Sequence, residues 1–486
     1  MRFVLAFVLL LAAQAQAATF TVTNTADSGA GSLRQALIDA GVDTSFPRVV
    51  QFGSAFPQGG VIELQTTLPT WSNDILKIEG NGRMPVLDGR NAVRILVVAA
   101  GTREITLRGL TFRRGRSTAA AGGCLWHQST TASTDLLVFD TRFEDCKAVA
   151  SQGNAYGGAI AWVSPDSTVF IYDSLFTGNA AGVIGNSSLK EAFGGAVLLD
   201  GRRVEIVGTR FSGNTVERVG GVVQGLGGAV YVGVTFSALL RDVEFQSNRV
   251  VDAAAGGVLS AGGAVALACL ESDCTLDITN AGFIDNAVSG NGIGGGALVT
   301  QGGRLALLNA SFSGNRVGDN GTGGAIFALP GELRARHLSF KDNDAAIGAH
   351  LAMSGVNVTQ WAWSLLGPVA EGSGPACGFG STTMDGPGVA NLFESDCGLL
   401  SASGGVIGPV GLLALNYSFF PATLVPGAGS SAIDPAVSQS DCFTLFDARG
   451  IVRPQDGDGD GISRCDAGAF EVQSSGIFSD GFEASP

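Results

Sequence analysis

One repeated phrase constrains the fold of this chain more than any other feature. The phrase is Phe-x-x-Asn, a segment of variable length, Gly-Gly-Ala and a short apolar run, after which Phe-x-x-Asn returns. Its clearest copies are FTGN (176–179) with GGAVLL (194–199), FSGN (211–214) with GGAVYV (227–232), FQSN (245–248) with GGAVAL (262–267), and FSGN (312–315) with GGAIFA (323–328). Eight phenylalanines of the phrase recur at intervals of 28 to 38 residues, a period typical of solenoids.

Each part of the phrase indicates a local structure. Gly-Gly permits a tight turn, and the apolar run after it alternates as a short strand does. If successive copies stack as rungs roughly 4.8 Å apart, every backbone group pairs with the rungs above and below. The phenylalanines then form one internal column, and hydrogen-bonded amides form another. The expected amide column is Asn179, Asn214, Asn248, Asn286, Asn315 and Asn343.

This pattern predicts an all-β fold, a right-handed parallel β-helix (solenoid) with an N-terminal helical cap and an irregular C-terminal cap. A run of antiparallel hairpins is the alternative, but hairpins need tight two-residue turns at short spacing, and those do not repeat here. The paired Phe-x-x-Asn and Gly-Gly-Ala repeats resemble those of polymorphic outer-membrane proteins and of other bacterial secreted β-helix proteins over roughly residues 78–355. The resemblance implies the fold but leaves the function open, because this scaffold serves many functions.

The N-terminus has the pattern of a secretory signal peptide, residues 1–17. Arg2 precedes the apolar run FVLAFVLLLAA and the small residues Ala15-Gln16-Ala17, with cleavage expected after Ala17 or, second, after Ala15. The apolar run is too short to span a bilayer, and no other stretch is long enough. We therefore expect a secreted or cell-surface protein with no transmembrane span.

Residues 18–45 are expected to cap the first rung with a strand and a short helix. Ser32 is the predicted N-cap, Gly41 the stop, and Leu33, Ala36, Leu37 and Ala40 the buried face. The segment Gly-Ser-Leu-Arg-Gln-Ala (31–36) resembles the Cys-Ser-Leu-Arg-Glu-Ala segment of secreted β-helix proteins, with the Cys absent.

The remaining chain divides into four expected parts. They are the β-helix over 46–366, irregular final rungs and a connection over 367–431, a capping module over 432–472, and a tail over 473–486. The module, AIDPAVSQSDCFTLFDARGIVRPQDGDGDGISRCDAGAFE over 432–471, resembles the choice-of-anchor Q module that follows bacterial β-helices. We expect it to cap the last rung.

The net charge restricts the classes of binding partner, and the cysteine content indicates the cellular compartment. The formal net charge is −14, which argues against nucleic acid or an anionic membrane surface as a partner. Eight cysteines in an exported chain indicate disulfides. Pairing of near neighbours gives Cys124–Cys146, Cys269–Cys274, Cys377–Cys397 and Cys442–Cys465, although the sequence cannot fix the connectivity.

An acidic run in the capping module is the sharpest ionic motif. Asp456, Asp458 and Asp460 alternate around glycines, and Asp466 follows. Alternating carboxylates gather oxygen ligands in calcium loops, so a structural Ca²⁺ is one interpretation and a solvated acidic turn is the other. No other cofactor is indicated.

Catalytic signals are weak. Asp140 and Asp173 stand three positions before successive phrase phenylalanines and would lie on adjacent rungs. Such a pair divides acid and nucleophile roles in glycosidases, but the same column suits a strand-ending turn, which we favour.

His337 and His350 are one rung apart and could meet. Four tryptophans could stack on sugars or pack inside: Trp126, Trp162, Trp361 and Trp363, of which the first two occupy equivalent places after Gly-Gly.

The longest departures from the rungs are 180–193, 215–226 and 249–261. Because they leave the same corner of successive rungs, they should form a ridge with a shallow groove beside it. The expected ligand-binding residues are Lys190, Glu191, Glu217 and Arg218. Mixed charge there suits a neutral or mixed-charge glycan or a protein surface better than a polyanion.

Two classes of function remain. The first is a secreted or cell-surface β-helix with a structural or adhesive role, a monomer that binds an extracellular glycan or protein through the ridge. The second is a polysaccharide lyase or glycoside hydrolase on the same scaffold. Enzymatic activity stays uncertain, and the sequence leans against it because no nucleophile motif and no acid–base cluster is evident.

Overall fold

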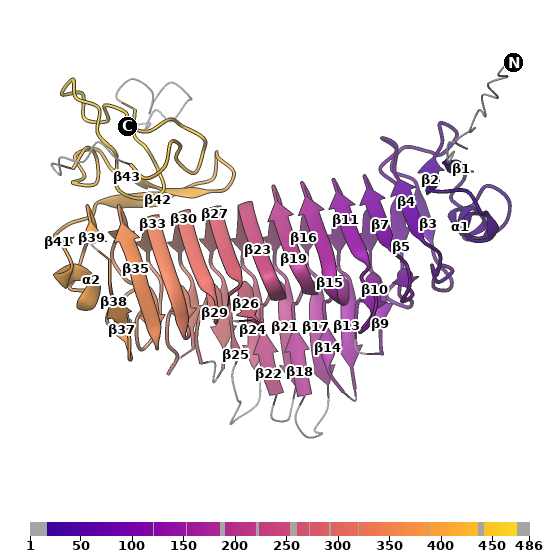
Figure 1. Cartoon of the computed structure of the whole chain (residues 1–486), viewed down its shortest axis with the longest axis horizontal. Coiled ribbons are helices and arrows are strands. Elements are labelled where there is room, and N and C mark those ends of the chain that lie inside the picture. Colours follow the sequence, from indigo (N-terminus) through magenta and orange to yellow (C-terminus); the bar gives the residue numbers. More distant parts are fainter. Residues whose placement is uncertain are drawn as a thin grey trace, which may run out of the picture.

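The chain forms an all-β parallel solenoid of about 11 turns in this computed structural model (Figure 1). The structure describes residues 17–119, 121–151, 153–184, 190–219, 223–252, 260–271, 273–290, 293–318, 320–386, 388–435 and 442–473. The expected signal peptide and the expected tail fall almost wholly on residues 1–16 and 474–486, which lie outside the described residues.

The body of the solenoid is built from parallel strands that pair rung to rung. In a central example, Val197 pairs with Ile160 of the preceding rung and with Val230 of the next. The first rungs contain β1 (Ala18–Val22), β2 (Arg48–Phe52), β3 (Val61–Glu63), β4 (Ile75–Glu79), β5 (Val86–Asp88), β6 (Leu96–Val98), β7 (Glu104–Arg108) and β8 (Thr111–Arg113). The regular rungs contain β10 (Leu125–Gln128), β11 (Asp135–Phe139), β12 (Arg142–Glu144), β15 (Ile160–Tyr172), β16 (Leu175–Thr177), β19 (Val197–Val207), β20 (Arg210–Ser212), β23 (Val230–Gln246), β26 (Val265–Cys269), β27 (Thr275–Ile284), β29 (Leu298–Gln301), β30 (Arg304–Ser313), β32 (Ile326–Ala328) and β33 (Gly331–Lys341). The last rungs contain β34 (Leu351–Met353), β35 (Val356–Ala362), β36 (Leu365–Leu366), β37 (Cys377–Phe379), β38 (Thr383–Met384), β39 (Gly388–Val389), β40 (Leu392–Phe393), β41 (Val406–Ile407) and the short helix α2 (Leu399–Ala402).

The predicted phenylalanine column is present in the core. Neighbouring rings are stacked along the axis with centroids 4.7 to 5.1 Å apart. The members are Phe112, Phe143, Phe176, Phe211, Phe245, Phe283, Phe312 and Phe340, all fully buried. The spacing equals the distance between rungs, so one ring in each turn fills the core without a gap.

The predicted asparagine column is also present, and its hydrogen bonding is complete. Asn214 is typical: its Nδ2 donates to Phe176 O and to Asn248 Oδ1, at 3.0 and 2.9 Å. Its Oδ1 accepts from the backbone N–H and the Nδ2 of Asn179. Burial of a polar side chain costs little folding free energy when all its hydrogen bonds are made, whereas burial without these hydrogen bonds is strongly destabilising.

The amide column ends at two different groups. At its N-terminal end the Cys146 N–H donates to Asn179 Oδ1, and Cys146 itself takes the place of an asparagine. At the other end Asn343 Nδ2 lies 3.2 Å from His350 Nδ1, and His350 Nε2 lies 2.8 Å from Gly367 O. The carbonyl requires a proton on Nε2, so Nδ1 is the acceptor and His350 is a neutral imidazole.

The N-terminal helix is α1 (Leu33–Val42), and its predicted N-cap residue is confirmed. Ser32 accepts a hydrogen bond from Gln35 N, and the four expected apolar residues are buried. The helix continues past Gly41 and ends before Asp43. It packs against β1 and β2, where it covers the open end of the first rung.

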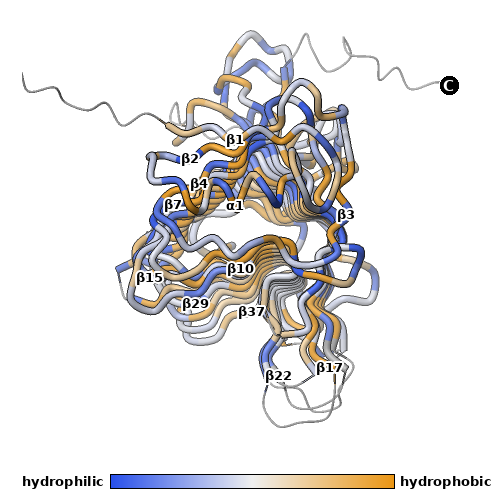
Figure 2. Tube along the Cα trace, turned by 90° about the vertical axis from the view of Figure 1, so that its right-hand side faces the viewer, coloured by the Kyte–Doolittle hydropathy of each residue, from blue (hydrophilic) through white to orange (hydrophobic). Residues whose placement is uncertain are grey.

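Two further parallel sheets project from one side of the body and form what we call the fin (Figure 2). One consists of β9 (Arg116–Ser117), β13 (Lys147–Ala150), β17 (Ala180–Ile184), β21 (Thr215–Val219), β24 (Arg249–Asp252), β28 (Ala287–Ser289) and β31 (Arg316–Val317). The other consists of β14 (Ala155–Tyr156), β18 (Lys190–Phe193), β22 (Val223–Leu226) and β25 (Ser260–Ala261). Small apolar side chains such as Ala181, Val216 and Ala192 form a core between the two sheets. The described part of the predicted ridge is therefore regular β-structure, because successive insertions pair with one another as the rungs do. Residues 185–189, 220–222 and 253–259 of the ridge lie outside the described residues.

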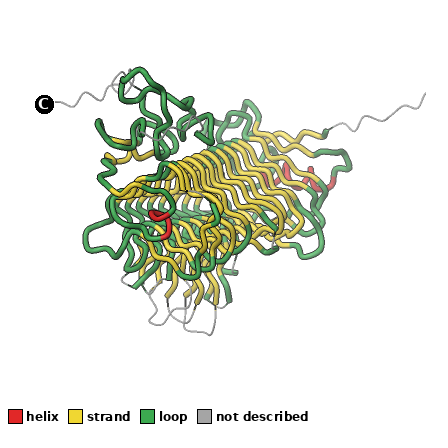
Figure 3. The backbone as a smooth tube through the Cα atoms, turned by 60° about the vertical axis from the view of Figure 1, so that its left-hand side comes forward, coloured by secondary structure: helices red, strands yellow, loops and turns green. Residues whose placement is uncertain are grey.

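The C-terminal module, by which we mean the described residues 412–473, lies along the side of the solenoid (Figure 3). It begins with the antiparallel strands β42 (Leu412–Asn416) and β43 (Thr423–Pro426). Ala422 N donates to Glu244 Oε2, His337 Nε2 donates to Cys442 O, and Gly468 N donates to Trp363 O. These contacts correct the expectation that residues 432–471 cap the last rung. The module instead covers the outward-facing apolar side chains of several rungs, Trp363 and Leu365 among them.

The four expected disulfides are all present. Their Cα–Cα distances are 5.7 Å for Cys124–Cys146, 5.9 Å for Cys269–Cys274, 5.3 Å for Cys377–Cys397 and 5.6 Å for Cys442–Cys465. These distances are normal for the bond. In the described part of the chain, no helix is long and apolar enough to cross a membrane.

Candidate functional site

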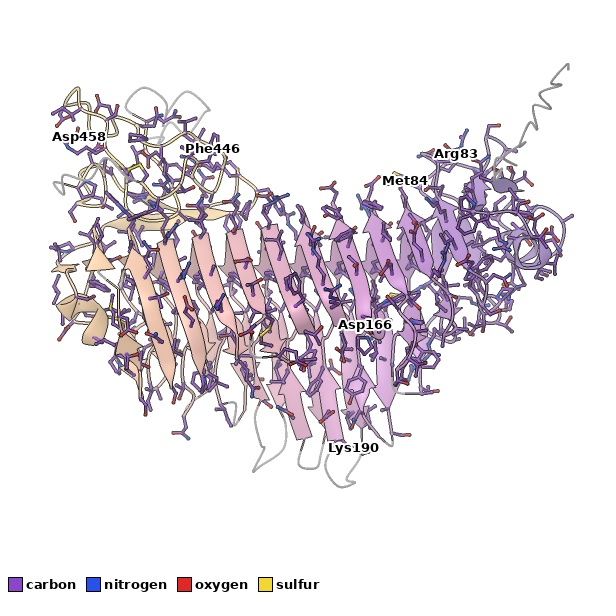
Figure 4. All side chains as sticks on the ribbon, viewed as in Figure 1. Arg83, Met84, Asp166, Lys190, Phe446 and Asp458 are labelled. Carbon is purple, nitrogen blue, oxygen red and sulfur yellow. A yellow bond between two sulfur atoms is a disulfide. The ribbon has the colours of Figure 1, made fainter. Side chains whose placement is uncertain are left out.

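The four ridge residues expected to bind a ligand lie on different faces of the fin. Lys190 is only 4% exposed and points between the two sheets, where its Nζ donates to Ser151 O at 3.0 Å. Glu191 lies on the outer face of β18, and the exposed Glu217 lies on the outer face of β21. The backbone of Arg218 pairs with Val183, and its side chain lies outside the described residues. Strand alternation separates neighbours in this way: Lys190 lies in the fin (Figure 4), and Glu191 faces the angle between β18 and the body.

An aromatic column runs through this angle. Tyr156 and Phe193 project from the fin strands β14 and β18, and Tyr231 projects from the body strand β23. Their ring centroids are 5.7 Å apart for Tyr156–Phe193 and 4.7 Å apart for Phe193–Tyr231. Sequence reasoning missed this column. The signal was an aromatic residue directly before Gly-Gly, in AYGG (155–158) and AFGG (192–195).

Glu191 is held beside the aromatic column by a polar network. Tyr156 Oη donates to Glu191 Oε2 at 2.6 Å, and Asn154 Nδ2 donates to the same oxygen at 3.2 Å. The backbone N–H of Glu191 donates to Asn154 Oδ1 at 3.0 Å. Burial, and next the hydrogen bond to Glu191, raise the pKa of the Tyr156 hydroxyl. The network orients the carboxylate of Glu191.

A second carboxyl group, that of Asp200, faces the same angle from β19. Within the described residues it has no hydrogen bond and no ion pair, and burial raises its pKa. The adjacent rung has Gly233 opposite it. A Cβ atom on Gly233 would lie 3.6 Å from Asp200 Oδ1, 3.7 Å from the Tyr231 ring and 3.5 Å from the Leu270 side chain. Asp200, Tyr231 and Leu270 therefore close over Gly233, which is itself buried.

Tyr231 lies between the two carboxyl groups. Burial raises the pKa of its hydroxyl to about 12, and the charges of Asp200 and Glu191 add to this effect. We call Tyr156, Glu191, Phe193, Asp200, Tyr231 and Gly233 the corner site. It combines the partly exposed rings of Tyr156 and Tyr231 and the buried ring of Phe193 with one oriented carboxylate and one carboxyl group that has no partner among the described residues.

The candidate catalytic pair Asp140 and Asp173 occupies strand-ending turns. Both residues are exposed and have left-handed backbone, with φ of 46° and 49°. The same conformation recurs down this column at Asp242, Asn280, Asn309 and His337. Asp and Asn tolerate it better than other residues, which explains the column without any chemistry.

The acidic run of the module is arranged differently from the expected calcium ligands. Asp434, Asp456 and Asp458 place ligand atoms within 4.8 Å of one another. Asp460 instead pairs with Arg464, with its Oδ2 3.0 Å from Nη1. Asp466 is 1% exposed and accepts from Asp434 N, so it supports the loop from beneath. Of the four expected residues, the structure thus brings two together and adds Asp434, which sequence reasoning missed because it lies 22 positions before Asp456.

The carboxylates of this loop already accept backbone hydrogen bonds. Asp434 Oδ2 accepts from Gly457 N and Asp458 N, and Asp456 accepts from Gly459 N and Gly461 N. Burial raises the pKa of Asp434. The calcium interpretation and the solvated-turn interpretation both remain predictions.

The histidines and most of the tryptophans are structural. His337 contacts the C-terminal module and His350 ends the amide column, so the two make separate contacts. Trp162, Trp361 and Trp363 are fully buried. Trp126 is partly exposed and pairs in register with Ala161, whereas Trp162 pairs with His127. The two tryptophans were expected at equivalent places, but their offset of one residue turns Trp126 outward and Trp162 inward.

Comparison with known proteins identified no relative. No family model, no curated protein and no solved structure matched the chain. The resemblances of the repeat and of residues 432–471 to named families therefore stay predictions.

Proposed function

We propose that this chain is an exported β-solenoid with an adhesive role, and that it binds an extracellular glycan at the base of its fin. The observation that carries the proposal is the corner site, where aromatic rings and two carboxyl groups from the fin and the body meet. Elsewhere in the rungs, side chains at repeated positions are occupied by stacking, as in the phenylalanine and asparagine columns. Recognition then has to come from segments that leave the rungs.

Export is supported by the four disulfides, since such bonds persist in oxidising compartments. The N-terminal pattern of residues 1–17 and the module over 432–471 point the same way. A glycan is favoured over a protein surface because hydroxyl-rich ligands use oriented carboxylates and aromatic rings.

Glycoside hydrolysis is the second candidate, and one observation favours it. Burial raises the pKa of Asp200, which has no partner among the described residues, while hydrogen bonds hold the Glu191 carboxylate in place. A glycosidase needs two carboxyl groups in different environments, one that acts as an acid and one that acts as a base or nucleophile. A lyase would in addition need a base beside an acidic sugar, and Lys190 is turned away from this face.

The experiment is a glycan array on the purified mature chain, combined with assays for reducing ends and for unsaturated products. Binding without product formation supports the adhesive role. New reducing ends that disappear in Asp200→Asn support hydrolysis. If the array shows no binding and a protein partner is found instead, glycan recognition is wrong.

A further inference from the structure

The last turn of the solenoid ends on an unpaired strand edge. β41 lies at the end of the body opposite α1 (Figure 1) and, among the described strands, pairs with β40 alone. Val406 N donates to Asn391 O, and Gly408 N donates to Phe393 O, both at 2.9 Å. Because backbone groups alternate in direction along a strand, the N–H and the C=O of Ile407 point away from β40. This edge can therefore accept a further strand.

Apolar side chains are exposed at the same edge. Val406 is 59% exposed and Ile407 is 55% exposed. The neighbouring helix α2 buries Leu400 in the core of the last turn, but it leaves the two side chains of β41 uncovered. At the opposite end of the body, α1 packs against β1 and β2. An exposed apolar strand edge is a template for pairing with another chain, so the C-terminal end of the solenoid is a candidate docking surface.

The last turn, residues 377–411, carries negative charge without a counter-charge. Residues 342–411 contain six Asp and Glu residues and no Lys or Arg. Three of the six, Asp385, Glu394 and Asp396, lie on the last turn, are exposed and form no ion pair with a described residue. Several carboxylates of earlier rungs, in contrast, pair with arginines. The end surface therefore attracts cationic groups.

These charges decide which strand can pair with β41. A second copy that docked end to end would bring its own three carboxylates to the same place. A second copy that docked with its N-terminal cap would bring residues 18–45, which contain three Asp and one Arg. Both arrangements place like charges together, whereas a strand with Lys or Arg side chains would form ion pairs. A polysaccharide has no backbone N–H and C=O groups with which to extend the sheet.

We propose that the C-terminal end of the solenoid binds an extended, basic segment of another protein, which pairs with β41 as an additional strand. The backbone of this segment hydrogen-bonds to Ile407, and its apolar side chains cover Val406 and Ile407. Its Lys or Arg side chains pair with the carboxylates of the last turn. The surface is separate from the corner site, so the inference goes beyond the proposed function and does not depend on it.

The test uses the full mature chain and two fluorescent peptides of eight residues. One peptide alternates Lys with Val, and the other alternates Glu with Val. Binding is followed by fluorescence anisotropy, and the bound region is located by hydrogen exchange. We expect the Lys peptide to bind, the Glu peptide not to bind, and added salt to weaken the binding. Exchange should slow over residues 399–411.

Two variants separate strand pairing from general attraction to an acidic chain. Ile407→Pro removes the outward N–H but none of the hydrogen bonds to β40, and proline is tolerated at a strand edge, so the variant should fold. It leaves the charge unchanged and should abolish binding. Asp385→Asn combined with Asp396→Asn should raise the Kd about fivefold.

Asp140→Asn combined with Asp173→Asn is the matched control for the two carboxylates. It removes the same charge from exposed turns in the middle of the body, where asparagine also tolerates the left-handed backbone. The Kd of the Lys peptide should stay that of the parent.

Each other outcome overturns the inference. If neither peptide binds, the carboxylates only prevent pairing at the edge. If Ile407→Pro binds the Lys peptide as the parent does, the attraction is general and β41 is not the site. If sedimentation shows a dimer that Ile407→Pro dissociates, the partner is a second copy. Should Ile407→Pro not fold, the Asp385→Asn and Asp396→Asn variant and the exchange over residues 399–411 decide.

Discussion

The body of the solenoid and the C-terminal module bury polar groups in opposite ways. In the body, neutral asparagines repeat once per rung and satisfy one another along a column. In the module, Arg453 and Glu471 are both fully buried and form an ion pair of 2.6 Å, and Arg453 also donates to Asp466 O and Gly468 O. The difference teaches that a repeat spreads its hydrogen bonding over many weak, equivalent contacts, whereas a single module depends on a few strong ones.

The largest expected effect is in the module. Arg453→Ala leaves Glu471 buried without its cation, which costs roughly 3–5 kcal/mol. Unfolding of the module should then precede that of the body, seen as early hydrogen exchange over 442–473. Arg464→Ala is the control, because its pair with Asp460 is exposed and should matter little. If Arg453→Ala melts in a single transition at the parental temperature, the ionic account of the module is wrong.

A smaller effect is expected from one member of the amide column. Asn214→Ala removes hydrogen bonds to both neighbouring rungs and leaves Phe176 O and the Asn179 amide without their partner. The cost is about 1–3 kcal/mol, measured by chemical denaturation. Asn416→Ala is the comparison, since that side chain is outside the column and, among the described residues, accepts from Ser418 N alone. Equal stability of the two variants would contradict the role of the column.

Acid should weaken the end of the amide column. Burial lowers the pKa of His350 to about 4 in the folded protein, against about 6.5 in the unfolded chain. Between these values the unfolded chain binds more protons, so stability is lost as the pH falls from 6.5 toward 4. One unit below 6.5 the loss is about 1 kcal/mol. His350→Gln should flatten this part of the stability profile, and a profile identical to that of the parent would show that His350 does not contribute.

The smallest expected effect concerns calcium in the acidic loop. If the ion binds, the melting temperature is higher with calcium than with chelator. At a calcium concentration equal to the Kd, the free energy of unfolding rises by about 0.4 kcal/mol. The rise should vanish in Asp458→Ala. It should persist in Asp460→Ala, because Asp460 pairs with Arg464 outside the cluster. An unchanged melting curve for the parent at millimolar calcium would leave the solvated turn as the explanation.

Periodic features could be predicted from the sequence, and single contacts could not. The phenylalanine column, the asparagine column, the Ser32 cap and the four disulfides follow from spacing or from near neighbours. The position of the C-terminal module could not be predicted, because its contacts with His337 and Trp363 join residues about a hundred positions apart.

The candidate site was predicted only in part. The insertions indicated a ridge, and Glu191 lies on the outer face of that ridge. The inward turn of Lys190 and the register that sets Gly233 opposite Asp200 follow from the pairing of strands in successive rungs, which the loop pattern did not reveal. Asp434 is distant from the acidic run in the sequence and comes close to it only in the folded chain.

Hydrogen exchange on the intact chain, with and without a neutral oligosaccharide, tests most directly whether the ligand binds in the corner between fin and body. The account predicts slower exchange in β18 and in the part of β23 around Tyr231–Gly233, with no change at the Phe170–Tyr172 face. Protection confined to that face or to the C-terminal module, with β18 unaffected, would contradict it.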